Sequence, residues 1–307
     1  MCGLVGGTAR DWDYDAALEA LTHRGPDADG MLRGTPFTVG FRRLSIIDLT
    51  PAANQPMLAD DGESWIVFNG EIYGFVAVRR ALEAEGERFR TSSDTEVVLR
   101  AYLRWGDTFI ERIDGMFAIV LWDARQRRLK LYRDRSGIKP LYYFWNGRDF
   151  GFASELKALE IATRRRGLTT DTTALYDFLT YRYVPSPKTP YRECRKLEPA
   201  HWLVFDPDAG TLEDPRRYWG IVVPEEPRTL SADEAAEELR SLLTRCVREQ
   251  MVADVPVGFF LSGGVDSSSV VAAATAVTML VFHGEERVFL RSADDQPRDE
   301  VDDVHAK

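Results

Sequence analysis

A cysteine at position 2 is the residue whose place in the chain points most directly to chemistry. The chain begins Met1-Cys2-Gly3, and cysteine is small enough for the initiator methionine to be removed in front of it. Cys2 would then carry a thiol and a free α-amine on one residue. The thiolate is a nucleophile, and an α-amine with a pKa of about 7.7–8.0 can act as its base near neutral pH. A lone cysteine is more often a small core hydrophobe, so other residues must decide.

Several polar residues of the same part of the chain could bind a small substrate, although each has an ordinary structural explanation. Arg43 ends an expected strand, where it could clamp an anion or simply face solvent. Asn69-Gly70-Glu71 follows an apolar run, but Asn-Gly commonly forms a hairpin turn. Asp94 could cap the following helix. His23, in a loop of turn-forming residues, is most simply hydrogen-bonded to backbone.

A second stretch with chemical potential is Ser262-Gly263-Gly264-Val265-Asp266-Ser267. It lies between an expected buried strand over 257–261 and an expected helix over 268–277. The start of a helix offers unpaired N–H groups and the positive end of the helix dipole, which together bind phosphate. An anion site is therefore favoured here over a plain turn.

The elements that must position the first group of residues indicate an α+β fold. Apolar runs and alternation predict strands over 37–44, 65–68, 115–123, 129–133, 141–145, 150–153 and 201–205, with helices over 12–21, 76–85 and 97–105. The strands over 141–145 and 150–153 are expected to pair as a hairpin. Hairpins with helices before and after them predict antiparallel sheet covered by helices.

The second half of the chain has a different pattern. After the Pro- and Glu-rich stretch 223–227, Ser231 and Glu234 form a capping-box pattern ahead of an amphipathic helix. We therefore predict one domain over 1–205, a linker over 206–230 and a second, α/β unit over 231–283, with a parallel strand over 279–283. Half of the residues from 284 to 307 are charged, and we expect this tail to be disordered.

Composition narrows the functional classes. The net charge of −10 argues against nucleic acid or an anionic membrane as the main partner, and no apolar run approaches about 18 residues. Three unpaired cysteines and four histidines suggest neither a disulfide framework nor a metal site, and we expect a cytoplasmic protein. Because only Met1 precedes Cys2 in this sequence, we do not expect Cys2 to be the lipidated residue of a lipoprotein.

Nine ordered motifs together resemble the glutamine-dependent asparagine synthetase family. They are MCGLVGG, HRGPD, RRLSIIDL, FNGEIYG, SSDTE, GMFAIVLWD, RDRSGIKPLYY, FASELKAL and FFLSGGVDSSSV. The resemblance implies a class II glutamine amidotransferase domain with the four-layer αββα sandwich of N-terminal-nucleophile hydrolases. It also implies that the second unit is an ATP pyrophosphatase domain.

The resemblance assigns roles to the first group of residues. Cys2 would be the nucleophile, its α-amine the proton carrier, and the Asn69 amide and Gly70 N–H the oxyanion hole. Arg43 would hold the α-carboxylate of glutamine, while Glu71 and Asp94 would hold its α-ammonium. The full implied glutamine-binding set is Arg43, Leu44, Ser45, Ile46, Ile47, Asn69, Gly70, Glu71 and Asp94.

The resemblance also implies the chemistry of the second unit. Ammonia from glutamine would pass inside the protein to a β-aspartyl-adenylate, so that glutamine, ATP and aspartate are the expected partners, with Mg²⁺ for the ATP half and no metal for glutamine hydrolysis. The assembly could be a homodimer. The implied ATP-binding residues are Leu261, Ser262, Gly263, Gly264, Asp266 and Ser267.

The sequence departs from the family pattern in two places. Gly74 stands where a second asparagine usually follows NGEIY, which we expect to change a loop contact only. The later SGEGxDE-type loop is absent from the 30 residues after Val277, so we expect a truncated synthetase half without ATP–pyrophosphate exchange. A non-catalytic glutamine-binding or scaffold remnant is the alternative from another class. Other class II amidotransferases lack SGGVDS and are less consistent with the sequence.

Overall fold

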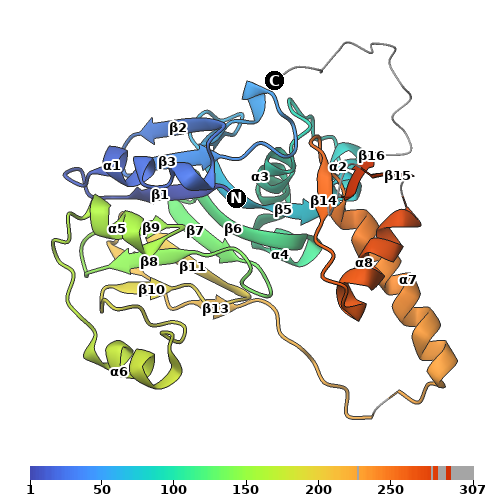
Figure 1. Ribbon diagram of the computed structural model, residues 1–307. Helices are drawn as coiled ribbons and strands as arrows, with labels where there is room; N and C mark the ends of the chain where they lie inside the picture. The colour runs from blue at the N-terminus through green and yellow to red at the C-terminus, as the bar shows by residue number, and fades with distance from the viewer. Residues whose placement is uncertain (227, 278, 283–287, 292–307) are drawn as a thin grey trace, which may run out of the picture. The chain divides into compact units, whose positions relative to one another are not determined.

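The computed structural model describes residues 1–226, 228–277, 279–282 and 288–291 (Figure 1). The chain folds into two compact units, Met1–Val223 and Pro224–Lys307. The first unit contains Cys2, Arg43, the Asn69–Glu71 stretch and Asp94, and the second contains the Ser262–Ser267 loop.

One antiparallel sheet of the first unit has β1, the strand directly after Cys2, between two neighbours. Its order is β10 (Cys194–Lys196), β8 (Tyr142–Trp145), β9 (Phe150–Ala153), β1 (Gly3–Gly7), β3 (Thr38–Arg43), β2 (Ala28–Arg33). Val5 lies opposite Gly40 on one side and Ala153 on the other. Because β1 is buried along its whole length, the chain directly after Cys2 is held in the interior of the unit, and Cys2 does not lie on a free terminal segment. The predicted hairpin of β8 and β9 is confirmed.

The other antiparallel sheet of the first unit carries Asn69, Gly70 and Glu71. Its order is β12 (Thr211–Leu212), β11 (His201–Asp206), β7 (Arg128–Arg133), β6 (Asp114–Asp123), β5 (Trp65–Tyr73), β4 (Met57–Leu58), with β13 (Arg216–Arg217) also paired to β11. The strand expected over 65–68 continues through Tyr73, so the hairpin-turn reading of Asn69-Gly70 is wrong. Gly70 lies opposite Phe117 on β6, and a Cβ there would stand 2.3 Å from the carbonyl oxygen of Met116. The close approach of β6 therefore requires glycine.

Helices cover the outer faces of both sheets, and three apolar clusters join the layers. One cluster fills the space between the sheets, including Leu4 and Phe41 from the first and Val67 and Val120 from the second. The other two join each sheet to its helices, so the unit has the predicted four-layer αββα arrangement (Figure 1). The α-helices are α1 (Tyr14–Glu19), α2 (Phe75–Ala84), α3 (Asp94–Trp105), α4 (Phe109–Arg112), α5 (Leu156–Ala162) and α6 (Thr172–Tyr181), and short 3₁₀ turns cover Thr22–Arg24, Pro51–Ala53 and Gly106–Thr108.

Among its described residues, the second unit contains two helices, α7 (Ala232–Gln250) and α8 (Val265–Thr275). The predicted capping box is confirmed: Glu234 N donates to Ser231 Oγ at 3.3 Å, and Ser231 N donates to the Glu234 carboxylate at 2.9 Å. The two helices pack through Val247, Ala273 and Ala274. Leu239, Leu242 and Phe260 are exposed in this unit.

The sheet of the second unit differs from the prediction. Its order is β14 (Val257–Phe259), β16 (Val288–Arg291), β15 (Met279–Phe282), and both pairs are antiparallel. A parallel strand over 279–283 beside 257–261 was expected, but β16 lies between the two strands. The apolar run Val288-Phe289-Leu290 within a charged stretch accounts for a strand inside the tail that we expected to be disordered. The rest of 284–307 lies outside the described residues.

The end of the first unit lies later than the start of the expected linker. β12 and β13 both fall within 206–230 and pair with β11, and Tyr218 donates to the carbonyl oxygen of Arg133 at 2.7 Å. Beyond these contacts Ile221, Val222 and Val223 are each more than 80% exposed. Packed chain therefore continues to about Tyr218, and the exposed connection follows it.

We expect limited proteolysis with elastase to cut first within Ile221–Val223, because these aliphatic residues are exposed and an exposed connection is where nicking concentrates. The product should be a stable fragment ending near Val223, identified by intact-mass spectrometry. First cleavage within 206–210, which joins β11 to β12, would contradict this boundary.

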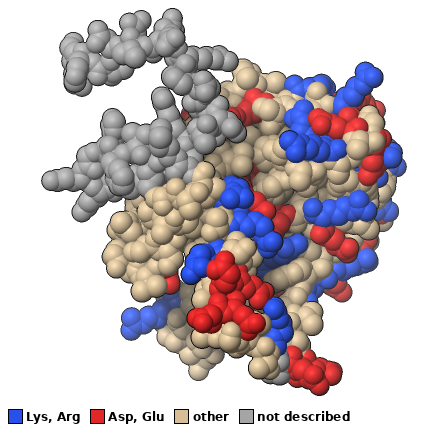
Figure 2. Space-filling model, turned by 90° about the vertical axis from the view of Figure 1, so that its right-hand side faces the viewer, with Lys and Arg blue, Asp and Glu red and all other residues tan. Residues whose placement is uncertain are grey.

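Charge is mixed on the face of the molecule seen in Figure 2, where Lys and Arg side chains lie beside Asp and Glu side chains rather than forming one continuous basic stripe. In the described part of the chain, no helix combines the length and apolar character needed to span a bilayer.

Candidate active site

The thiol of Cys2 lies against the chain that leaves β3. Its Sγ is 3.4 Å from the backbone nitrogen of Leu44, which donates to it, and 3.6 Å from the carbonyl oxygen of Leu44. Burial raises the pKa of the Cys2 thiol, and the Leu44 N–H opposes that rise. A buried thiol of this kind needs a base to become a thiolate at neutral pH.

The carbonyl oxygen of Cys2 is held by Arg24, a buried residue to which no role was predicted. Arg24 Nε donates to it at 2.9 Å, and Arg24 Nη1 donates to Glu155 at 3.0 Å. His23 also contacts Glu155, at 2.8 Å, rather than the backbone. The HRGPD motif therefore fixes the main chain of Cys2, a role that its turn-forming composition did not reveal.

The side-chain amide of Asn69 is almost fully buried, with 1% of its surface exposed. Neither its Nδ2 nor its Oδ1 has a hydrogen-bond partner among the residues that the structure describes. Leaving such groups unpaired costs about 1–3 kcal/mol. Cys2 packs against the inter-sheet cluster that contains Ala118, and Ala118 lies directly opposite Asn69. An amide donor is thus held ready in the same part of the interior as the thiol.

Asp94 lies in the first turn of α3 with 6% of its surface exposed. Ser93, not Asp94, is the N-cap and accepts from Glu96 N at 3.3 Å, so the capping explanation for Asp94 is wrong. Its carboxylate instead accepts from Ile72 N at 3.1 Å, next to Glu71 on β5. Burial raises the pKa of Asp94 to about 7, and the charge of Glu71 contributes to the rise. Two neighbouring carboxylates in a buried place would favour a bound cation.

Arg43 is buried and its two terminal nitrogens are fully engaged. Nη1 donates to the carbonyl oxygen of Thr50 at 2.9 Å and to Asn54 Oδ1 at 2.7 Å, and Nη2 donates to the carbonyl oxygens of Ile47 and Asp48. These bonds use all the N–H groups of those nitrogens. To clamp a carboxylate with both nitrogens, as predicted, Arg43 must therefore exchange some of these acceptors for the ligand.

The half-buried segment 44–47, predicted to contact glutamine, is the chain that Arg43 holds. Leu44 contacts Cys2 as described, Ser45 N donates to Asp27 at 2.7 Å, and the Ile47 carbonyl accepts from Arg43 at 3.3 Å. Ile46 is half-buried between them. The structure thus brings this segment next to the thiol.

Lys139 is a second residue to which no role was predicted. It lies in the RDRSGIKPLYY motif, and its side chain is 6% exposed. Burial lowers the pKa of its ammonium, while the charges of Glu71 and Cys2 oppose that shift. The motif marked the stretch, but its apolar neighbours gave no reason to place this lysine beside Glu71.

In the second unit, the loop from Ser262 to Ser267 leads into α8, which begins at Val265 rather than at the expected Ser268. Gly264 is the N-cap and supplies no side-chain bond, and Gly263 has a φ of +77°. The Ser262 and Ser267 hydroxyls are 3.0 Å apart. The first N–H groups of α8 thus lack a side-chain cap, which suits an anion. Leu261 is half exposed and Asp266 is exposed.

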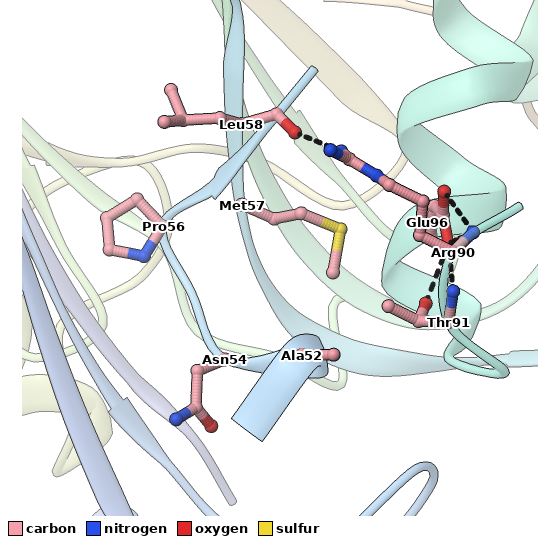
Figure 3. Close-up of a pocket in the computed structure, with 8 residues that line it drawn as sticks. All are labelled: Ala52, Asn54, Pro56, Met57, Leu58, Arg90, Thr91 and Glu96. Atoms are coloured by element: carbon pink, nitrogen blue, oxygen red, sulfur yellow. Dashed lines mark hydrogen bonds between the residues drawn. The ribbon is translucent and has the colours of Figure 1, made fainter. Parts of the chain in front are cut away.

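A pocket of about 330 Å³ lies elsewhere on the first unit (Figure 3). None of the predicted glutamine-binding residues lines it, and it meets the site only through Asn54, a partner of Arg43. Its lining residues are Ala52, Asn54, Pro56, Met57, Leu58, Arg90, Thr91 and Glu96. Glu96 is occupied by Arg90 and Thr91, as the dashed lines show. Within the described residues, no group of three His, Cys, Asp or Glu side chains could hold a metal ion.

Comparison with known proteins agrees with this arrangement. A family model for a glutamine amidotransferase domain matches residues 1–219, and one for asparagine synthase matches residues 238–302. Asparagine synthetase [glutamine-hydrolyzing] 1 of Bacillus subtilis is 36% identical over 311 residues, covering 98% of this chain and 47% of that protein. Amidase chry2 of Gibberella zeae is 36% identical over 267 residues, covering 84% of this chain and 38% of that protein. The chain thus spans about half the length, or less, of these curated relatives.

A solved structure shows the fold alone. The glutamine phosphoribosylpyrophosphate amidotransferase from B. subtilis superposes with a TM-score of 0.54 at 17% identity, covering 90% of this chain and 64% of that one. The fold, the family match over residues 1–219 and the asparagine synthase match that follows agree. The chain therefore belongs to the glutamine-hydrolysing asparagine synthetase family, with a glutamine amidotransferase domain ahead of asparagine synthase sequence.

Proposed function

We propose that the Met1–Val223 unit hydrolyses glutamine to glutamate and ammonia, with Cys2 as nucleophile after removal of Met1. The observation that carries the proposal is the amide of Asn69, buried and unpaired next to the layer that holds Cys2. A donor kept free at a stability cost fits an oxyanion hole, in which charge appears only during reaction.

The bond changes follow from these residues. The α-amine of Cys2 takes the thiol proton, and Sγ attacks the carboxamide carbon of glutamine while Asn69 Nδ2 and the Gly70 N–H stabilise the oxyanion. The C–N bond then breaks, the α-ammonium returns the proton to the leaving nitrogen, and ammonia departs. Water attacks the resulting thioester by the same route, which releases glutamate and restores the thiol.

Recognition of free glutamine would come from the charged residues around Cys2. Glu71 and Asp94 supply the negative charge that an α-ammonium requires, and Arg43 is the buried cation nearest the Leu44–Ile47 segment. Glutamine binding would replace some of the carbonyl partners of Arg43 with the α-carboxylate, so that binding and movement of this segment are linked.

We expect kcat/KM for glutamine to fall as the pH decreases through about 7, because Asp94, with its pKa raised to about 7, then gains a proton and no longer attracts an ammonium. Asp94→Asn should raise KM by about 10- to 100-fold, the worth of one hydrogen bond to a charged group, with little change in kcat. Its profile should lose the fall near pH 7 that Asp94 causes, while the part of the acid limb that Glu71 contributes remains.

The measurement is a set of steady-state rates between about pH 6 and pH 9, with Asp15→Asn, an exposed carboxylate on α1, as the matched control. A variant at position 94 that keeps the wild-type acid limb and KM would remove Asp94 from the ammonium site.

For the second unit we propose that the Ser262–Ser267 loop binds the pyrophosphate part of ATP, with Leu261 near the adenine, as in the family implied by the sequence. The uncapped start of α8 and the two facing hydroxyls fit a phosphate, and ATP with Mg²⁺ would activate a carboxylate for attack by ammonia. We propose aspartate as that carboxylate in the whole family protein. One relative of similar identity is named an amidase, so the acceptor of the ammonia requires a separate test.

The free thiols at all three cysteines fit a cytoplasmic location, and a homodimer is compatible with the proposed function.

The test of the central proposal is glutamine-dependent release of glutamate and ammonia by the purified chain, measured together in equal amounts. Equal release that Cys2→Ala abolishes supports it. If the chain binds glutamine in calorimetry but releases neither product, the scaffold alternative holds instead.

A further inference from the structure

The side chain of Lys139 is mostly buried beside the proposed glutamine site, and no described residue accepts a hydrogen bond from its ammonium. Only 6% of the Lys139 surface is exposed, and within the described part of the chain no group accepts a hydrogen bond from its Nζ or pairs with it as an ion within 4.0 Å. A buried unpaired charge costs several kcal/mol unless other charges compensate it. A negative charge nearby would reduce this cost.

The backbone of Lys139 is fixed relative to β5. The fully buried carboxylate of Asp134 accepts from Lys139 N at 2.9 Å and from Phe117 N at 3.1 Å. Phe117 in turn lies opposite Gly70 on β5. Arg133 Nε also donates to the carbonyl oxygen of Lys139 at 2.9 Å. The side chain of Lys139 therefore starts from a fixed backbone position that lies one strand away from Asn69–Glu71.

The charge that compensates Lys139 most strongly is that of Glu71. Among the charges that act on Lys139, Glu71 has the largest favourable effect, followed by Cys2, with Arg24 opposing and Asp134 a smaller contribution. Lys139 is likewise the cation that opposes the burial of Glu71. The charge of Glu71 also acts on Asp94 and Tyr73, and the charge of Lys139 acts on the amino terminus of the chain.

The separation of the two groups matters for function. A direct ion pair would occupy the carboxylate oxygens of Glu71, yet no described residue donates a hydrogen bond to them. A cation at longer range keeps Glu71 negative and leaves its oxygens free for a substrate ammonium. Arg43, by contrast, already donates its hydrogen bonds to groups of the protein.

We propose that Lys139 is a positioning residue of the glutamine site, the fixed counter-ion that holds Glu71 ionised and unoccupied so that it can bind the α-ammonium of glutamine. This role rests on the proposed glutamine hydrolysis. Lys139 would act through Glu71 and would not touch the reacting carboxamide.

The first test is the pH profile of kcat/KM for Lys139→Met, which keeps the length of the side chain and removes its charge. Loss of a cation near a carboxylate should move the acid limb upward by about one pH unit, so kcat/KM at a pH below the limb falls about tenfold, mainly through KM. Lys139→Arg should keep the limb near its wild-type place. Lys188→Met, at a half-buried lysine paired with Asp177 away from the proposed glutamine site, is the matched control and should change nothing.

A double-mutant cycle shows whether the effect passes through Glu71. In a Glu71→Gln background, Lys139→Met should not move the limb further. That double variant buries no unbalanced charge, so it should fold even if Lys139→Met alone does not. Three results would each overturn the proposal. They are an acid limb that stays unchanged in Lys139→Met, an equal shift of the limb in Lys139→Arg, and the same shift caused by Lys139→Met in the Glu71→Gln background.

A readout without activity separates this proposal from the proposed function. Burial raises the pKa of Glu71, so the native state loses stability as the pH rises above the pKa that Glu71 has in the unfolded chain. The charge of Lys139 reduces this loss of stability. Lys139→Met should therefore lower Tm more at about pH 8 than at about pH 5, and this difference should vanish with Glu71→Gln. If no variant hydrolyses glutamine but this dependence holds, the hydrolysis fails and the pairing stands. If wild type hydrolyses glutamine and the dependence is absent, the Lys139 proposal fails.

Discussion

Replacing Cys2 by alanine is expected to abolish glutamine hydrolysis, with a loss on the order of 10⁶-fold in kcat, as for removal of a nucleophile from a catalytic unit. The thiol lies 3.4 Å from Leu44 N, and Arg24 holds the Cys2 carbonyl at 2.9 Å. Water cannot replace a nucleophile fixed in this way. Ammonia release at constant glutamine concentration measures the effect.

A permanent extension in front of Cys2 should cause a similar loss, because it converts the α-amine into an amide that cannot accept a proton. Burial already lowers the pKa of the Met1 amine, one residue further out, so an amine on Cys2 would be placed to act as a base. The matched control is Cys246→Ala, which removes a half-buried free thiol of the second unit and should leave the rate unchanged. Normal hydrolysis by a protein with a blocked terminus would rule out the shared-residue mechanism.

Asn69→Ala is expected to lower kcat by about 10²–10³-fold with little change in KM, the effect of removing one oxyanion donor. The Asn69 amide has no partner in the described part of the protein, so its removal breaks no hydrogen bond that holds the fold. Stability should therefore fall less than for a typical buried polar residue, and the effect should appear in the chemical step.

Steady-state kinetics and thermal unfolding check this expectation together. Asn146→Ala, in the turn between β8 and β9, is the control for loss of an asparagine away from the site. A rise in KM with unchanged kcat would instead make Asn69 a ground-state binding residue.

Much of the first unit could be predicted because local and long-range signals agree there. The apolar run from Gly115 to Asp123 became β6, which begins one residue earlier than predicted, and the hairpin of β8 and β9 formed where Asn146-Gly147 indicated. Asn69-Gly70 could not be placed by local preference, because pairing with β6 overrides its tendency to turn. Register across the sheet, which a single sequence does not display, decides that case.

The candidate site shows the same limit. Cys2, Arg43, Glu71 and Asp94 stood out by residue type and motif, yet the saturation of Arg43 and the role of Ser93 as helix cap needed coordinates. Lys139 was missed because its importance depends on a contact between β6 and the loop after β7. Long-range geometry of this kind leaves no local trace in the chain.

The measurement that tests the central claim most directly is covalent capture of the nucleophile. The purified chain is incubated with a glutamine analogue that carries a γ-diazoketone in place of the carboxamide, and the adduct is mapped by peptide mass spectrometry. We predict one adduct per chain, on a Cys2 that has become the first residue, with glutamine slowing its formation. An adduct at Cys194 or Cys246, or glutamine hydrolysis that continues while Cys2 is fully modified, would contradict the assignment.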